Sequence, residues 1–99
     1  MPGLHAPQTL RLPARLDAAA LGQIRLALLD LQGQAVRLEA DGVERAGALA
    51  LQLLLAARKT WRAHGAELSI IGPSPALVDA LERLGGSELL PSAPTGDGA

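Results

Sequence analysis

The chain of 99 residues offers few side chains that could act together in catalysis or hold a metal ion. It has no cysteine, and its two histidines, His5 and His64, lie in different segments without the spacing of a zinc-binding helix. The glycines match neither of the two common phosphate-binding loops. We expect no histidine to activate any of the scattered hydroxyl side chains, which are Thr9, Thr60, Ser69, Ser74, Ser87, Ser92 and Thr95. The sequence therefore indicates a protein that is not an enzyme and that uses no metal and no cofactor.

Composition and charge argue against contact with nucleic acid or insertion into a membrane. The chain is 48 % apolar and 19 % charged, which favours one folded core, and Trp61 is the only aromatic residue in it. A net charge of −1 gives no overall attraction to nucleic acid. The longest mostly apolar run, 46–57, is too short to span a bilayer. Because cysteine and a signal-peptide pattern are both absent, we expect a cytoplasmic protein.

Alternating and helical hydrophobic periods predict an α/β fold in the order β-α-β-α-β-α, with a possible last strand. The expected architecture is a sandwich of a mostly parallel or mixed four-stranded sheet and three helices. We expect a flexible N-terminus over 1–7, a single domain over 8–90 and a disordered tail over 91–99. The predicted elements, in order, are 8–16, 19–31, 35–41, 46–64, 67–72, 75–84 and 87–90.

Several residues have predicted structural roles within these elements. Asp17 and Ser74 stand where each would cap the helix that follows it. Ser74 is also the most exposed-looking alternative site of phosphorylation, although we expect it to be a cap. The strand 67–72 reads ELSIIG and is expected to be almost completely buried. In the helix 46–64, Leu51 and Leu55 fall on the polar side, which predicts either an exposed docking surface or cover by a loop or the sheet edge.

Three segments, in the right order and spacing over 9–86, resemble the signature elements of the STAS domain family (sulphate transporter and anti-sigma factor antagonist): TLRLPARLD, VRLEADGVERAGALALQLLLAARK and ELSIIGPSPALVDALERLGG. The first resembles the opening strand with its LxGxLD element, the second the central signature, and the third the closing segment. The similarity is greatest to the short, stand-alone bacterial members. The resemblance implies a STAS-like sandwich that binds other proteins.

The resemblance also implies a phosphorylation site, from which this chain departs. In many members a partner serine kinase phosphorylates a Ser or Thr, next to an Asp, at the start of the second helix. Carried over residue by residue, the Asp position falls on Gly47 and the Ser or Thr position on Ala48. Ala48 has no hydroxyl group and cannot accept a phosphoryl group. The phosphosite is therefore degenerate, and Ala48 mimics a permanently unphosphorylated residue.

These observations predict a constitutive protein-interaction module that resembles an anti-sigma factor antagonist in bacterial signalling or regulation. Its partner would be a serine kinase, an anti-sigma-type protein or another signalling protein. Two alternatives stay open: an accessory subunit that binds the ATPase of an ABC-type lipid transporter, and a sensor of a small ligand or nucleotide. A homodimer is also possible. The predicted partner-binding residues are Asp41, Gly42, Val43, Glu44, Arg45, Gly47, Ala48, Leu51 and Leu55.

Overall fold

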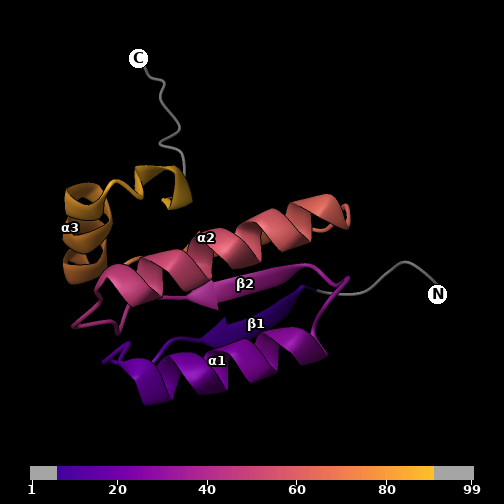
Figure 1. Ribbon diagram of the computed structural model, residues 1–99, viewed down its shortest axis with the longest axis horizontal. Helices are drawn as coiled ribbons and strands as arrows, with labels where there is room; N and C mark the ends of the chain where they lie inside the picture. Colours follow the sequence, from indigo (N-terminus) through magenta and orange to yellow (C-terminus); the bar gives the residue numbers. More distant parts are fainter. Residues whose placement is uncertain (1–6, 91–99) are drawn as a thin grey trace.

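Strands and helices alternate along residues 7–90, the part of the chain that the computed structural model describes (Figure 1). The elements are β1 (Gln8–Arg11), α1 (Ala18–Asp30), β2 (Val36–Glu39), α2 (Ala48–Ala63), β3 (Leu68–Ile71), α3 (Pro75–Leu84) and a 3-10 helix, η1 (Ser87–Leu89). The predicted succession of three strands and three helices is thus confirmed. None of the helices described is long and apolar enough to cross a membrane.

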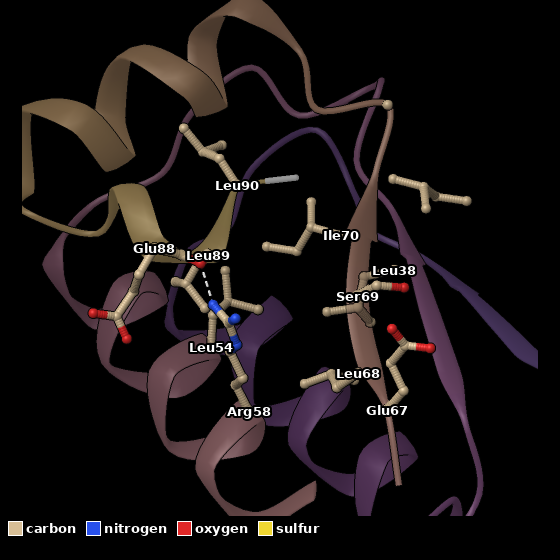
Figure 2. Close-up of a pocket in the computed structure, with 12 residues that line it drawn as sticks. Leu38, Leu54, Arg58, Glu67, Leu68, Ser69, Ile70, Glu88, Leu89 and Leu90 are labelled. Carbon is tan, nitrogen blue, oxygen red and sulfur yellow. Dashed lines mark hydrogen bonds between the residues drawn. The ribbon is translucent and has the colours of Figure 1, made fainter. Parts of the chain in front are cut away.

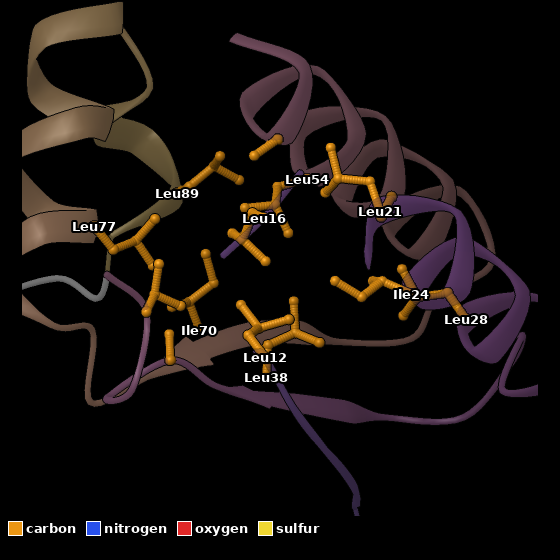
Figure 3. Packing of buried hydrophobic residues seen from close by; sticks show 14 of the residues in the cluster. Leu12, Leu16, Leu21, Ile24, Leu28, Leu38, Leu54, Ile70, Leu77 and Leu89 are labelled. Carbon is orange, nitrogen blue, oxygen red and sulfur yellow. The ribbon is translucent and has the colours of Figure 1, made fainter. Parts of the chain in front are cut away.

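The three strands form a parallel sheet in the order β1-β2-β3, so that β2 is the central strand. Leu10, Leu38 and Ile70 lie side by side in its register. In β2, Val36 and Leu38 are fully buried, whereas Arg37 between them is exposed, which confirms the predicted alternation. Helices α1 and α2 cover the buried face (Figure 3). The side chains that β1 and β2 carry on the opposite face are polar.

The core between the sheet and the helices is almost entirely aliphatic (Figure 3). Helix α1 contributes a stripe of Leu21, Ile24 and Leu28, at the spacing of three and four residues that one face of a helix requires. Trp61 of α2 is 3 % exposed, and its indole Nε1–H donates to the Gln34 carbonyl oxygen at 2.6 Å. This bond satisfies the one polar atom of the buried ring and ties the end of α2 to the loop before β2.

The fourth strand predicted over 87–90 is wrong for the described part of the chain. Residues 87–89 form the helix η1, in which the Leu89 amide donates to the Gly86 carbonyl oxygen at 2.9 Å. The described sheet has three strands, all parallel, and β3 is therefore an edge strand. For the same reason the expected near-complete burial of β3 is also wrong: only Ile70 is buried, while Leu68 and Ile71 are half-buried.

Two predicted boundaries need correction, and two predicted segments lie outside the described residues. The first strand ends at Arg11 rather than at 16, because Pro13 has no amide hydrogen for the sheet and the chain bends at Ala14. Helix α2 begins two residues later than expected, since residues 46 and 47 are not yet helical. The predictions for residues 1–6 and for the tail 91–99 concern residues that are not described.

Candidate functional site

The loops that follow the three strands meet at one edge of the sheet, where the strands have their carboxyl ends (Figure 1). These loops are 12–17, 40–47 and 72–74. Open α/β sheets place their binding sites at this edge, because loops from different strands converge there. The turn 41–45 and the first turn of α2, which contain most of the predicted partner-binding residues, lie at this edge.

Backbone hydrogen bonds from the loop after β1 hold one side of the turn 41–45. The carbonyl oxygen of Ala14 accepts from the amides of Glu44 and Arg45, at 2.7 and 3.0 Å. The Leu16 amide in turn donates to the Arg45 carbonyl oxygen at 3.0 Å. Leu12 and Leu16 of the same loop are buried in the core. Their burial holds the loop in place, and with it the backbone groups that bond to the turn.

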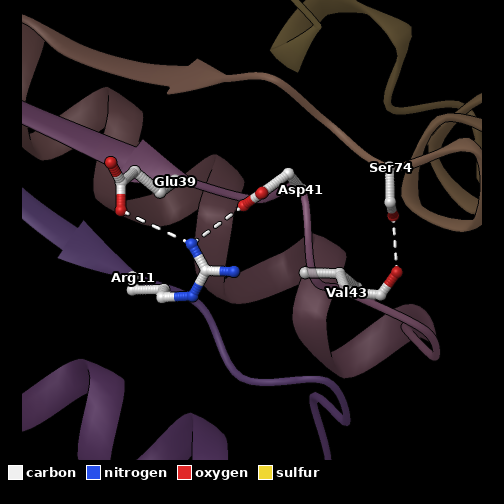
Figure 4. Close-up of polar contacts among 5 residues, drawn as sticks. All are labelled: Arg11, Glu39, Asp41, Val43 and Ser74. Carbon is white, nitrogen blue, oxygen red and sulfur yellow. Dashed lines mark hydrogen bonds and ion pairs between the residues drawn. The ribbon is translucent and has the colours of Figure 1, made fainter.

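The start of α3 holds the other side of the turn (Figure 4). The Ser74 hydroxyl donates to the Val43 carbonyl oxygen at 2.5 Å and accepts from the Leu77 amide at 3.1 Å. The Ser74 amide donates to the Ala40 carbonyl oxygen at 3.0 Å. Ser74 is therefore a helix cap, as expected, but it is only 7 % exposed, and its apparent exposure in the sequence was wrong. A buried hydroxyl with both bonds made is a poor substrate for a kinase.

The start of α2 lacks the side-chain caps that the other two α-helices have. Its N-cap residue is Gly47, which has an extended backbone and no side-chain hydrogen bond. By contrast, Asp17 caps α1 by accepting from the Ala20 amide at 2.9 Å. The first turn of α2 contains no acidic residue either. Its first amides therefore have no side-chain acceptor within the described residues.

An exposed ion cluster connects β1 to the turn (Figure 4). The Arg11 Nη1 lies 3.0 Å from Asp41 Oδ1 and 3.7 Å from Glu39 Oε1. The three side chains are 41–64 % exposed, so water screens their attraction. The cluster orients the turn more than it stabilises the fold.

The predicted partner-binding residues divide into exposed and covered ones. Asp41, Glu44, Arg45, Gly47 and Ala48 are exposed, and they lie together at the carboxyl edge. The remaining four are not freely exposed: Val43 is 2 % exposed, while Gly42, Leu51 and Leu55 are half-buried.

Long-range packing accounts for the covered residues. The side chain of Val43 is part of the core, and its carbonyl oxygen accepts from the Ser74 hydroxyl, so Val43 supports the turn from within. Leu51 packs against Gly86, where an added Cβ would lie 2.3 Å from Leu51 Cδ1. Leu55 lines a hollow with Arg58 and Glu88. Gly86 thus covers part of Leu51, whereas Leu55 stays partly accessible in that hollow.

Leu49 is a large apolar residue exposed at this edge, and it is not among the predicted partner-binding residues. Leu49 is 63 % exposed in the first turn of α2, next to Gly47 and Ala48. Its position in the helical period could have identified it, because it lies one residue before buried Ala50 and five before buried Leu54. We refer to Gly47, Ala48 and Leu49 together as the α2 start.

The described residues do not bring a catalytic or metal-binding cluster to this edge. No group of three His, Cys, Asp or Glu side chains among them is arranged to hold a metal ion. The ring of His64 lies at the far end of α2, where its Nδ1 is 2.8 Å from the Thr60 carbonyl oxygen rather than from the hydroxyl. His5 lies outside the described residues.

The described residues form a small α/β domain with a parallel three-stranded sheet and three α-helices. The family model described as "Mlab, STAS domain" matches residues 4–91, nearly the whole chain. The chain therefore belongs to the STAS domain family, which confirms the resemblance. STAS domains generally mediate protein–protein interactions and are generally non-catalytic. Searches of curated proteins and of solved structures gave no significant match.

Proposed function

We propose that this chain is a non-catalytic protein-interaction module that resembles an anti-sigma factor antagonist and acts in bacterial signalling or regulation. Its binding surface consists of the α2 start and the exposed side chains of the turn, Asp41, Glu44 and Arg45. The observation that carries the proposal is the exposed Leu49, which follows Gly47 and Ala48 at the only α-helix start within residues 7–90 that has no side-chain cap. A small apolar centre with a charged rim is the composition of a protein-binding surface.

The proposed binding is constitutive because the α2 start offers no hydroxyl group. Gly47 and Ala48 occupy the positions at which many family members carry Asp and Ser or Thr. From 41 to 59 the chain contains neither Ser nor Thr, so a kinase has no acceptor in the turn or in the first three turns of α2. The partner would therefore bind without the usual control by phosphorylation. A kinase-related, anti-sigma-type or other signalling protein is the expected partner.

The missing hydroxyl also favours a second candidate, the ATPase of an ABC-type lipid transporter. Some short members of the family are accessory subunits of such transporters. A subunit that stays assembled needs no phosphorylation switch, and an uncharged α2 start suits a permanent contact. Both candidates use the same surface and differ in the partner.

A charge placed at the α2 start tests the surface. In Ala48→Glu, a carboxylate stands in the first turn, where the helix dipole favours it, so the fold should be retained. Burying that charge against an apolar partner surface should weaken binding at least about tenfold, or about 1.4 kcal/mol. The measurement is a pull-down from the native lysate, read by mass spectrometry, followed by titration of the recovered partner.

The matched control is Ala63→Glu, which makes the same change at an exposed position of the same helix. Ala63 is 15 residues away, or about 22 Å at the helical rise. The proposal requires that Ala63→Glu retain the partner that Ala48→Glu loses. The identity of the protein that only Ala48→Glu loses decides between the two candidates: a signalling protein supports the first, and an ABC ATPase supports the second. If both variants retain every partner, the α2 start is not the binding surface. A rise in melting temperature on addition of nucleotides would then support the alternative of a small-ligand sensor.

A further inference from the structure

Helix α1 carries apolar residues on two nearly opposite faces. One face is the buried stripe of Leu21, Ile24 and Leu28. The other is exposed and follows the same spacing of three and four residues; we call it the outer stripe, and it consists of Ala19, Gly22, Leu26 and Leu29. Leu26 is 64 % exposed and Leu29 is 49 % exposed. Because the outer face of a surface helix is normally polar, the outer stripe is not explained by the fold of one chain.

The outer stripe is uncharged and uncovered within the described part of the chain. Figure 1 shows α1 at the border of the molecule, with none of the described elements beyond it. The polar residues of α1 flank the stripe on its two sides and do not interrupt it: these are Gln23, Arg25 and Asp30. The hollow of about 380 Å³ beside β3 differs, because the Arg58 guanidinium lies among its apolar side chains (Figure 2). The outer stripe therefore suits an apolar occupant.

Gly22 indicates that this occupant approaches closely. A glycine inside a helix costs about 1 kcal/mol of stability relative to alanine. The fold of the chain does not require it: its φ is not positive, and outside its own helix no described atom lies within 4 Å of a Cβ built there. A missing side chain does, however, leave a notch into which a side chain of a second helix fits.

The outer stripe is complementary in shape to a second copy of itself. Its first half is small, with Ala19 and Gly22, and its second half is large, with Leu26 and Leu29. When two copies of α1 pack antiparallel about a two-fold axis beside Ile24, Leu26 of each copy meets Gly22 of the other, and Leu29 meets Ala19. Ile24 is the midpoint of both pairs, so one axis produces both contacts twice. Large side chains thus enter small sites throughout, as in a knobs-into-holes helix pair.

We propose that the outer stripe of α1 is the contact of a weak homodimer, in which the two α1 helices pack antiparallel. A helix of 13 residues is about 20 Å long, so this contact is smaller than the roughly 800 Å² per partner of a standard interface. We therefore expect a dissociation constant on the order of 100 µM. The contact uses a different helix from the α2 start, so either proposal can fail while the other holds.

Sedimentation equilibrium of the full chain between about 10 µM and 1 mM measures the dimer. Leu26→Arg should weaken it at least about tenfold, because both symmetric contacts then bury a guanidinium against an apolar neighbour. The matched control is Leu84→Arg, the same change at a leucine of α3 that is 41 % exposed, and it should leave the dissociation constant unchanged. Salt at about 1 M should strengthen the wild-type dimer, since Arg25 of the two copies lie on the same flank near the axis and repel each other.

Disulfide formation tests the antiparallel register. The chain has no cysteine, so introduced thiols are the only ones present. A mixture of Gly22→Cys and Leu26→Cys should form the mixed disulfide, because facing positions of packed helices approach the Cα separation of about 6 Å that a disulfide needs. Gly22→Cys alone should form severalfold less, since its two copies are offset by about 6 Å along the helix axes.

Three results would overturn the proposal. The first is a chain that stays monomeric at about 1 mM; if Leu26→Arg then lost a protein recovered from the native lysate, the outer stripe would belong to that protein. The second is a dimer that Leu26→Arg leaves intact or that high salt dissociates, because its contact would lie elsewhere or depend on ion pairs. The third is equal disulfide formation by Gly22→Cys alone and by the mixture, which would exclude the antiparallel register.

Discussion

Helices α2 and α3 both begin at the carboxyl edge of the sheet, yet their starts are built in opposite ways. At α3, Ser74 is 7 % exposed, and its hydroxyl joins the Leu77 amide to the Val43 carbonyl oxygen. At α2, Gly47 offers no side chain, and Leu49 is 63 % exposed. The start of α3 is therefore held by hydrogen bonds within the chain, whereas the start of α2 exposes Leu49 and has no side-chain cap. The contrast shows that the start of α3 is fixed by contacts within the fold, and it is the reason why we propose the α2 start as the binding surface.

Ser74→Ala should produce the largest loss of stability in this comparison. It removes the cap of α3 and leaves the buried Val43 carbonyl oxygen without its donor. We expect the free energy of unfolding to fall by about 2 kcal/mol, as measured by urea denaturation. Ser87→Ala is the control, because Ser87 is exposed and its hydroxyl makes no hydrogen bond among the described residues. If Ser74→Ala and Ser87→Ala both changed the free energy of unfolding by the same small amount, the Ser74 hydroxyl would not stabilise the start of α3.

Gly47→Asp should have a smaller effect of opposite sign. The extended backbone of Gly47, with φ −128° and ψ −162°, accommodates a side chain without strain. A carboxylate there would cap α2 as Asp17 caps α1, and we expect a gain of about 0.5 kcal/mol in the free energy of unfolding. Asp17→Gly, the reverse change on α1, should lower stability by a similar amount.

The same Gly47→Asp variant tests why α2 is left without a cap. If the α2 start is a binding surface, added stability should come with weaker partner binding, because the new charge must be desolvated in the complex. Stability and binding are then measured on one protein, by urea denaturation and by titration of the partner. An unchanged affinity would mean that the missing cap is merely tolerated.

Local patterns were sufficient to predict the three strands, the three α-helices and the cap of α3. The alternation around Leu38 predicted β2, and the Ser74-Pro75 pair predicted the first residue of α3. Gly85 ends α3 at φ +85°, a backbone conformation that glycine adopts without steric cost. Each of these features depends on residues adjacent in the chain, so the sequence contains the information needed to predict it.

Features that depend on distant contacts were predicted poorly. A helical wheel places Leu51 on a polar side of α2, but it cannot show that Gly86 packs over it. Val43 belongs to a turn that the sequence suggests is exposed, but its side chain lies in the core and its carbonyl oxygen accepts from Ser74, 31 residues later. Residues 87–90 are a short run that suits a strand or a helical turn equally, and tertiary packing selects the 3-10 helix. The sequence therefore predicted which segments lie at the carboxyl edge of the sheet, but not which of their residues are exposed.

The smallest expected effect on stability belongs to Arg11→Met, which removes the ion pairs of the turn while retaining an apolar stem. Because Arg11, Glu39 and Asp41 are all largely exposed, we expect the free energy of unfolding to change by less than about 0.5 kcal/mol. Any difference should disappear in about 1 M salt, where the screening length falls to about 3 Å. Urea denaturation at low and high salt measures both.

Partner binding should respond to Arg11→Met more than stability does. The Arg11 guanidinium forms an ion pair with Asp41 at the beginning of the turn. In Arg11→Met this ion pair is absent, so the charged side chains of 41–45 should be less well ordered beside the α2 start. We expect a severalfold weaker affinity from the slower formation of a correctly oriented complex. Arg37→Met is the control, since Arg37 is also exposed on the open face but makes no ion pair within residues 7–90. If both variants bind alike, the turn is not part of the surface, and binding depends on the α2 start alone.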